Sequence, residues 1–247
     1  MMIKRILILC AVFVFLGDFA LAKVTQLNYK ATFGMFGTIG TIKNTLTQNA
    51  KTYKIQTKVQ LAGIAKSLMG GQVEDYVSKG HMHNGLMISD TYTMTSTKKD
   101  KIVKKEYYIN HKDKYVTKHY RKWRKGKLVK DKKEKLKFYA KDDLLTLYFN
   151  LGTAIKEKGK TYHFKAVGLE KQKGKVQITV PSNHKNAIYK QNLGAGAALY
   201  AKALIHQKNF KKKKGDIFLA IDKDGFIRNS VIKDVLIIGD AKLVRMK

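Results

Sequence analysis

Apolar and polar residues alternate with a period of two along much of this chain, which is typical of β-strands with one buried face. From Tyr53 to Leu61 the apolar residues alternate mainly with lysine and glutamine. Leu27, Tyr29 and Ala31 alternate with polar neighbours in the same way. Further strand candidates are 73–80, 86–96, 103–110, 115–123, 128–138, 161–167, 176–180, 217–222, 226–233 and 235–244.

Short turns separate these segments, and several contain glycine, a pattern typical of β-hairpins. The clearest are Asn84-Gly85, Lys125-Gly126, Lys173-Gly174 and Asp224-Gly225. Because a flat sheet of this size would leave long exposed edges, we expect the sheet to curl. The predicted fold is mainly β: a single curved antiparallel sheet or half-open β-barrel of about 10–12 strands, with one or two short helices packed on it.

Two segments break the strand pattern. Residues 62–69 predict a short helix, and residues 142–151 predict a longer one that Asp142 caps and Gly152 ends. The apolar stripe of the longer helix must pack on the sheet. It consists of Leu144, Leu145, Leu147, Tyr148 and Leu151. Residues 187–206 are rich in alanine and glycine and are compatible with either a strand or a helix.

The first 22 residues have the features of a cleavable signal peptide. Lys4 and Arg5 precede eleven uncharged residues, and Ala20-Leu21-Ala22 supplies the small residues that signal peptidase recognises. The apolar run is shorter than the ~20 residues that a membrane-spanning helix needs. We therefore expect residues 1–22 to be removed and residues 23–247 to form a single β-rich periplasmic domain, since no linker interrupts them.

Cys10 is the only cysteine, and it lies within the apolar run of the signal peptide. Leu9 precedes it where a lipoprotein signal requires a small residue, so we expect no lipid anchor. The mature chain then has no thiol, which excludes disulfides, cysteine metal ligands and cysteine nucleophiles.

The charge of the chain is strongly positive, at +32, and it remains +31 without residues 1–22. Such a charge favours polyanionic partners. For an exported protein these are lipid headgroups, lipopolysaccharide phosphates and acidic glycans, and no nucleic acid is expected. The alternative is that the lysines merely solvate a β-sheet surface, because lysine lacks the bidentate geometry of arginine.

Several short segments, taken in order, form a series. They are Leu27-Asn28-Tyr29, Phe36-Gly37 with Gly40, Tyr53-Lys54-Ile55, Gly63-Ile64, Asp142-Asp143-Leu144-Leu145-Thr146-Leu147, Asp222-Lys223-Asp224-Gly225 and Gly239. Through these segments the chain resembles a bacterial exported family known as a domain of unknown function, number thirty-one hundred and eight. The resemblance covers nearly all of the mature chain. The resemblance implies a curved antiparallel β-sheet, similar in outline to periplasmic lipoprotein carriers of the Lol type, and it implies no established activity.

Candidate chemistry is sparse. His81 and His83 share one face of a strand, but no third ligand lies near them in the sequence, so we expect no metal site. No nucleophile or dinucleotide-binding motif is complete, so we expect neither an enzyme nor a cofactor.

A lipid-binding groove is the first functional hypothesis. The predicted helix 142–151 and the predicted strand 53–61 would line it. The candidate contacts to an acyl chain or lipidated envelope component are Leu144, Leu147, Tyr148, Tyr53 and Ile55.

Residues 98–137 carry 18 Lys/Arg against five Asp/Glu, with aromatic residues between them. This composition favours peripheral contact with an anionic membrane surface. The candidate contacts are Arg121, Lys122, Trp123, Arg124 and Lys125. The alternative function is a structural or adaptor protein of the cell envelope that binds acidic polymer or a partner protein through this basic surface. The oligomeric state does not follow from the sequence.

The export signal generates a direct prediction. Intact mass spectrometry of the protein purified from its host should give a chain that begins at Lys23, because the cleavage pattern ends at Ala22. A mass that retains residues 1–22 would contradict the signal-peptide interpretation.

Overall fold

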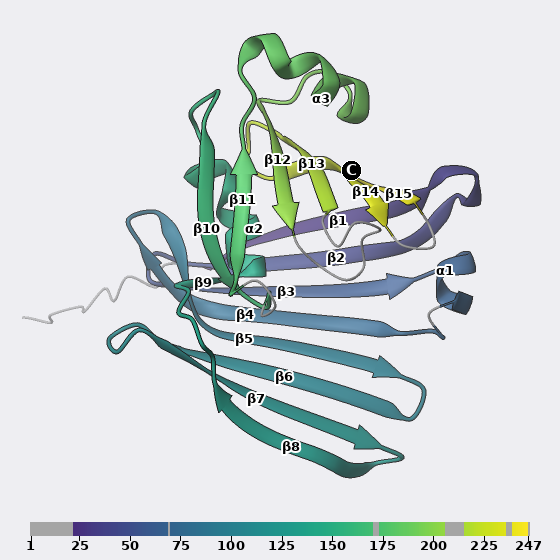
Figure 1. The fold of residues 1–247 in the computed structure, drawn as a ribbon, viewed down its shortest axis with the longest axis vertical. Helices are drawn as coiled ribbons and strands as arrows, with labels where there is room; N and C mark the ends of the chain where they lie inside the picture. The colour runs from purple at the N-terminus through teal and green to yellow at the C-terminus, as the bar shows by residue number, and fades with distance from the viewer. Residues whose placement is uncertain (1–21, 69, 170–172, 206–214, 236–238, 247) are drawn as a thin grey trace, which may run out of the picture.

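A curved sheet dominates the computed structural model (Figure 1). The structure describes residues 22–68, 70–169, 173–205, 215–235 and 239–246, and within these residues fifteen strands are connected in one sheet. The strands are β1 (Lys23–Phe33), β2 (Thr38–Gln48), β3 (Thr52–Leu61), β4 (Val73–His83), β5 (Leu86–Lys98), β6 (Lys101–Asn110), β7 (Tyr115–Arg124), β8 (Lys127–Lys135), β9 (Asp142–Asp143), β10 (Thr161–Val167), β11 (Lys175–Thr179), β12 (Leu199–Ile205), β13 (Gly215–Ile221), β14 (Ile227–Val235) and β15 (Gly239–Arg245). The helices are α1 (Gly63–Leu68), α2 (Leu144–Ala154) and α3 (Asn186–Leu193).

Strands β1 to β8 form a meander in which each strand pairs antiparallel with the next. At the β4–β5 turn Asn84 and Gly85 have φ angles of 49° and 75°, and at the β7–β8 turn Lys125 and Gly126 have φ angles of 47° and 74°. Positive φ at both central residues is the geometry of a type I′ turn, whose twist matches that of the flanking strands. These turns therefore fix the register of the long hairpins.

The second half of the chain extends the same sheet from its other side. β15 pairs antiparallel with β1, with Tyr29 opposite Arg245, so the first and last strands lie side by side within the sheet. The order then runs through β14, β13, β12, β11 and β10 to β9, which pairs in parallel with β10. Within the described residues β8 and β9 are the two ends of the order, and the sheet is open between them.

Helix α2 packs inside the curve of the sheet. Its Phe149 contacts a buried cluster that includes Tyr29 and Ile55, whereas Leu151 contacts a second cluster that includes Leu219. We call the sheet face that carries these residues the pocket face and the opposite face the outer face. On the outer face, α3 covers Phe218 and Val231, among others. None of the helices in the described residues is long and apolar enough to span a membrane.

The predicted fold class is confirmed, because the protein is mainly β, with one curved sheet and short helices. The described residues contain more strands than expected, since the alternation does not predict β2, β9 or β12. In β2 the buried Asn44 breaks the apolar pattern, and β9 is only two residues long. The undecided segment contains both structures, α3 followed by β12. The expected signal peptide lies outside the described residues except for Ala22.

Both predicted ends of the longer helix are wrong. Asp143, not Asp142, is the N-cap, because its carboxylate accepts hydrogen bonds from the backbone N–H groups of Leu145 and Thr146. Gly152 lies within α2, which continues to Ala154. Its lack of a side chain serves packing, since a Cβ at this position would lie 2.3 Å from the carbonyl oxygen of Gly225.

The substitution Gly152→Ala should destabilise the protein, although the same change in an exposed helix stabilises it by about 1 kcal/mol. The added methyl group overlaps the Gly225 backbone, and overpacking of this kind costs about 1–3 kcal/mol. Urea unfolding measures the change. Thr153→Ala, at the exposed neighbouring position, is the control and should be neutral or slightly stabilising. A Gly152→Ala variant as stable as that control would contradict the close approach of the two glycines.

Candidate functional site

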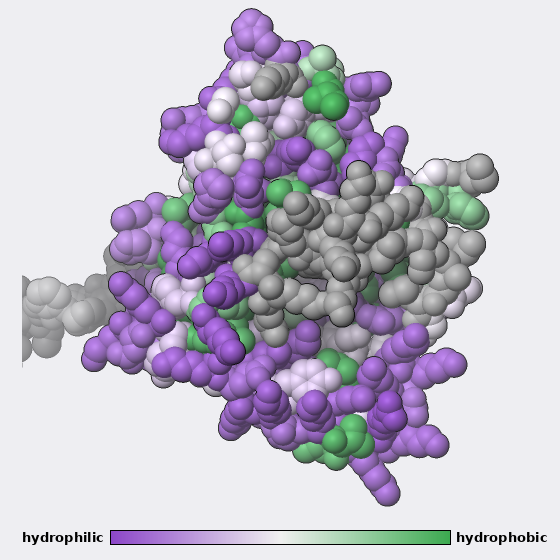
Figure 2. Space-filling model, viewed as in Figure 1, coloured by the Kyte–Doolittle hydropathy of each residue, from purple (hydrophilic) through white to green (hydrophobic). Residues whose placement is uncertain are grey.

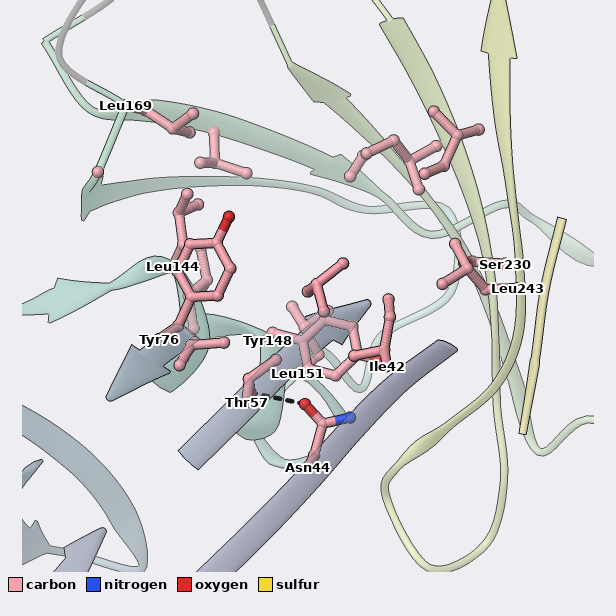
Figure 3. Close-up of a pocket in the computed structure, with 18 of the residues that line it drawn as sticks. Ile42, Asn44, Thr57, Tyr76, Leu144, Tyr148, Leu151, Leu169, Ser230 and Leu243 are labelled. Atoms are coloured by element: carbon pink, nitrogen blue, oxygen red, sulfur yellow. Dashed lines mark hydrogen bonds between the residues drawn. The ribbon is translucent and has the colours of Figure 1, made fainter. Parts of the chain in front are cut away.

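A largely apolar pocket of about 780 Å³ lies between α2 and the pocket face of the sheet. Its walls come from both halves of the chain: Figure 3 shows Ile42 of β2, Leu151 of α2 and Leu243 of β15 around the same space. The aliphatic residues that strands contribute to the walls include Ile42, Val59, Val176, Ile178, Ile217, Leu219, Ile232 and Leu243.

Helix α2 supplies one side of the pocket through a regular stripe. Leu144, Leu147, Tyr148 and Leu151 line the pocket, and their spacing of three, one and three residues places them on one face of the helix. Leu145 also contributes to the lining. The position of α2 therefore decides the width of the pocket.

Polar side chains at the floor of the pocket are bonded to each other or to the backbone. The Thr57 hydroxyl donates to Asn44 Oδ1 (2.6 Å; Figure 3). Asn44 Nδ2 donates to the carbonyl oxygen of Leu27 (2.8 Å). These groups are satisfied within the protein, so they need no polar partner from a ligand. The floor can thus lie against an apolar ligand without leaving a buried donor or acceptor unpaired.

One end of the pocket is more polar. Glu74, Tyr76 and Lys105 belong to the lining, and the Tyr76 hydroxyl donates a hydrogen bond to Glu74. Gln72 Nε2 donates to the other oxygen of the same carboxylate (2.6 Å). Burial raises the pKa of Tyr76 well above its usual value, and the Glu74 charge raises it further, so the phenol remains protonated. This end points toward β6, the strand that carries Lys105.

The Asp143 carboxylate fixes α2 against the sheet. It is fully buried and accepts five hydrogen bonds. Two come from backbone N–H groups in the first turn of α2, and one comes from the Thr146 hydroxyl. The other two come from the hydroxyl groups of Ser78 of β4 (2.5 Å) and Ser89 of β5 (2.6 Å). Burial raises the pKa of Asp143, and the hydrogen bonds from Ser78, Ser89 and Thr146 oppose the rise.

Tyr53 completes this network. Ser78 and Thr146 each give their only hydroxyl hydrogen to Asp143, so the Tyr53 hydroxyl, 2.6 Å from Thr146 Oγ1, must be the donor to that oxygen. Burial raises the pKa of Tyr53 well above its usual value, with Asp143 adding to the rise, and this keeps the donor hydrogen in place.

Asp142, the residue before the cap, is a second buried carboxyl group. Its side chain is 5% exposed and its Oδ1 atom has no hydrogen-bond partner in the described residues. Burial raises the pKa of Asp142 to about 7, the Lys141 charge lowers it, and the Asp143 charge raises it. The two adjacent aspartates therefore differ in role: Asp143 is held by donors and Asp142 is not.

The candidate groove residues fall into two groups. Leu144, Leu147 and Tyr148 line the pocket. Tyr53 and Ile55 lie behind it, in the buried cluster around Phe149, where they support α2 and do not form the pocket wall. Sequence reasoning missed Glu74, Tyr76 and Lys105. Glu74 and Lys105 are charged, so an apolar pattern does not point to them, and Tyr76 has the same alternation as many other strand residues.

The five candidate surface residues do not form one patch, because neighbouring residues of a strand point to opposite faces. Arg121 and Trp123 lie on the outer face, where the guanidinium carbon is 5.5 Å from the Trp123 ring centroid and Arg121 pairs with Glu106. Lys122 and Arg124 lie on the pocket face, and Lys125 is in the exposed turn. Hydrophilic side chains cover much of the visible surface over β6 to β8 (Figure 2).

The candidate histidine pair is also divided between two environments. His81 Nδ1 is 3.0 Å from Asp90 Oδ1, and His111 Nε2 is 3.3 Å from the same oxygen. His83 is exposed beside the β4–β5 turn. No group of three or more residues in the described part of the chain has the arrangement of a metal site.

The chain matches no protein-family model and no curated protein sequence. Among solved structures it is similar to the crystal structure of a beta-barrel-like protein of the domain of unknown function DUF1849 from Brucella abortus, with a TM-score of 0.50 and 11% sequence identity. The match covers 90% of this chain and 95% of that chain. At this identity the likeness concerns the fold alone, and it supports a β-barrel-like domain. The resemblance to family thirty-one hundred and eight and to Lol-type carriers stays a prediction.

The buried Asp142 predicts how stability depends on pH. Because its pKa is higher in the folded state than the ordinary value of 3.8, the folded protein binds more protons between about pH 4 and pH 7. The free energy of unfolding should therefore fall as the pH rises through this window. Between pH 5 and pH 8 the Asp142 carboxyl group should account for roughly 2–3 kcal/mol of the fall in the free energy of unfolding, and Asp142→Asn should remove this part.

Urea unfolding at both pH values measures this difference. Asp100→Asn, in an exposed turn, is the control and should leave the pH dependence unchanged. If the Asp142→Asn and wild-type proteins lose the same stability between pH 5 and pH 8, the Asp142 carboxyl group is not the source of the pH dependence.

Proposed function

We propose that this protein is an exported, non-enzymatic binding or carrier module that holds the acyl chain of a lipid or lipidated envelope component. The apolar pocket between α2 and the sheet carries this proposal. Its volume of about 780 Å³ is within the range of about 300–1,000 Å³ for small-molecule sites.

The chemistry of the walls favours a hydrocarbon chain over a polar ligand. Most lining residues are aliphatic or aromatic, and the Asn44–Thr57 pair at the floor is already satisfied. A polar ligand would lose its water and find few partners there, which is unfavourable. Each CH₂ group that enters such a pocket contributes about 0.8 kcal/mol.

Export supports the same function. The signal-peptide features of residues 1–22 direct the chain to a compartment bounded by membranes, where lipids and lipidated proteins are available ligands. The resemblance to periplasmic lipoprotein carriers agrees with this assignment. The absence of a complete catalytic motif in the sequence favours binding over catalysis.

A second candidate is an envelope adaptor that binds acidic polymer through its basic surface. The edge strand β8 favours it, because this strand is largely exposed and carries five lysines. Salt separates the two functions: charge-driven polymer binding weakens strongly between low and moderate ionic strength, whereas burial of an acyl chain depends little on salt.

Acyl binding can be measured by displacement of the neutral dye Nile red with neutral monoacylglycerols. Affinity should rise up to roughly fourfold for each added CH₂ until the pocket is filled. Val59→Trp, which places a large ring at the pocket wall, should weaken binding at least tenfold. Gln60→Trp, on the exposed outer face of the same strand, is the matched control and should bind like the wild type.

Native mass spectrometry of the protein purified from its host provides an independent test. A bound mass that disappears after solvent extraction is expected. Absence of such a mass, together with absence of monoacylglycerol binding, would contradict the carrier function, and salt-sensitive binding of an acidic polymer alone would favour the adaptor.

A further inference from the structure

Four cations gather on the pocket face where β6, β7 and β8 meet. In the strand register Lys101 lies opposite Arg124, and Lys122 lies opposite Lys130. Directly opposed residues point to the same face of a sheet, and so do residues two apart in one strand. Lys101 is four residues from the pocket-lining Lys105 on β6, so all four cations share the face of the pocket.

These cations repel each other. The pKa of Lys122 is lowered chiefly by the Arg124 charge, with further contributions from loss of solvent and from Lys101 and Lys130. None of the four forms an ion pair with a carboxylate among the described residues. On the same face, the nearby Glu134 is already engaged by Lys132 (2.6 Å) and Lys118 (3.3 Å).

The outer face of the same strands has a different charge pattern. There Glu106 pairs with Lys104 and Arg121, and His119 Nε2 is 2.6 Å from Asp131. Two carboxylates, Glu106 and Asp131, thus neutralise cations of the outer face, whereas Glu134 is the carboxylate that these strands carry on the pocket face among the described residues. The excess of positive charge is therefore concentrated on the pocket face. A surface that only needed solvation would not require this difference between its two sides.

Strand register places the cation cluster beside the polar end of the pocket. Lys105 lies in the polar end of the pocket, opposite Tyr120 of β7. Lys122 is the next residue of β7 on that face, a diagonal position about 7–8 Å from Lys105. Lys130 Nζ lies 5.6 Å from the Tyr120 ring centroid. A molecule that leaves the pocket past Lys105 therefore meets Tyr120 and then the cluster.

We propose that Lys101, Lys122, Arg124 and Lys130 bind the phosphate-bearing headgroup of the lipid whose chain occupies the pocket. This inference rests on the proposed acyl-binding function and specifies the ligand as an anionic, phosphate-bearing amphiphile. A phosphate group accepts hydrogen bonds from several cations at once and relieves their repulsion.

The test compares two ligands with the same chain, palmitoyl lysophosphatidic acid and monopalmitoylglycerol, in the Nile red displacement assay. At low salt the wild type should bind the phosphate-bearing lipid about tenfold more tightly, and this preference should shrink at about 0.3 M salt. Lys122→Gln/Lys130→Gln should reduce the preference to about threefold or less and leave binding of monopalmitoylglycerol unchanged. The variant should fold, because it removes two like charges that face each other on neighbouring strands.

The matched control is Lys133→Gln/Lys135→Gln. It removes the same charge from the outer face of β8, opposite His119 and Thr117, and should retain the preference. Equal loss of preference in both variants, or no loss in either, overturns the headgroup site. If inorganic phosphate displaces lysophosphatidic acid at a concentration equal to that of the lipid, the headgroup site is also overturned, because the cations then bind a free anion.

The outcomes separate this inference from the proposed function. If the wild type binds monopalmitoylglycerol but shows no preference for the phosphate-bearing lipid, only the headgroup site is wrong. If it binds lysophosphatidic acid through these lysines but does not bind the neutral lipid, the acyl pocket is wrong. Binding of neither lipid overturns both.

Discussion

The buried Asp143 carboxylate joins the start of α2 to two strands more than fifty residues earlier in the chain. A carboxylate removed from water is costly unless its oxygen atoms accept hydrogen bonds, and five donors surround this one. The donors come from α2, β4 and β5, so the group is satisfied only when the helix sits at one place and in one orientation. That placement sets the position of every α2 side chain relative to the sheet.

The pocket follows from this constraint. A sheet of fifteen described strands encloses more space than one helix of eleven residues fills. Phe149 packs against the first half of the sheet and Leu151 against the second, while the stripe that begins at Leu144 faces the remaining space. The helix is held at its N-terminus by hydrogen bonds and at Gly152 by close packing against Gly225. These two contacts keep it from moving into the space that its apolar stripe faces, so the pocket stays open.

Charge is distributed by the same alternation that builds the sheet. On β7, Arg121 and Lys122 are neighbours in sequence but lie on opposite faces, one beside Glu106 and the other among cations. The net charge of the protein therefore says little about where an anion would bind. The register between β6, β7 and β8 places the unneutralised positive charge on the side that leads into the pocket.

The sequence by itself determined the elements with strong local signals. Period-two alternation predicted most of the strands, the Asn84-Gly85 and Lys125-Gly126 pairs predicted tight hairpins, and the leucine spacing after Asp143 predicted a helix with one apolar stripe. Leu144, Leu147 and Tyr148 were accessible to sequence analysis because a stripe on a helix must face an apolar surface.

Only the tertiary structure decided which contacts these elements make. Tyr53 and Ile55 have the same alternation as a pocket wall, but α2 covers them. The choice of Asp143 over Asp142 as the cap depends on the hydroxyl groups of Ser78 and Ser89, which are distant in sequence. Lys105 and the four-cation cluster become a unit through strand register. Local sequence fixes the period of a strand, whereas register and packing depend on long-range contacts that no local pattern contains.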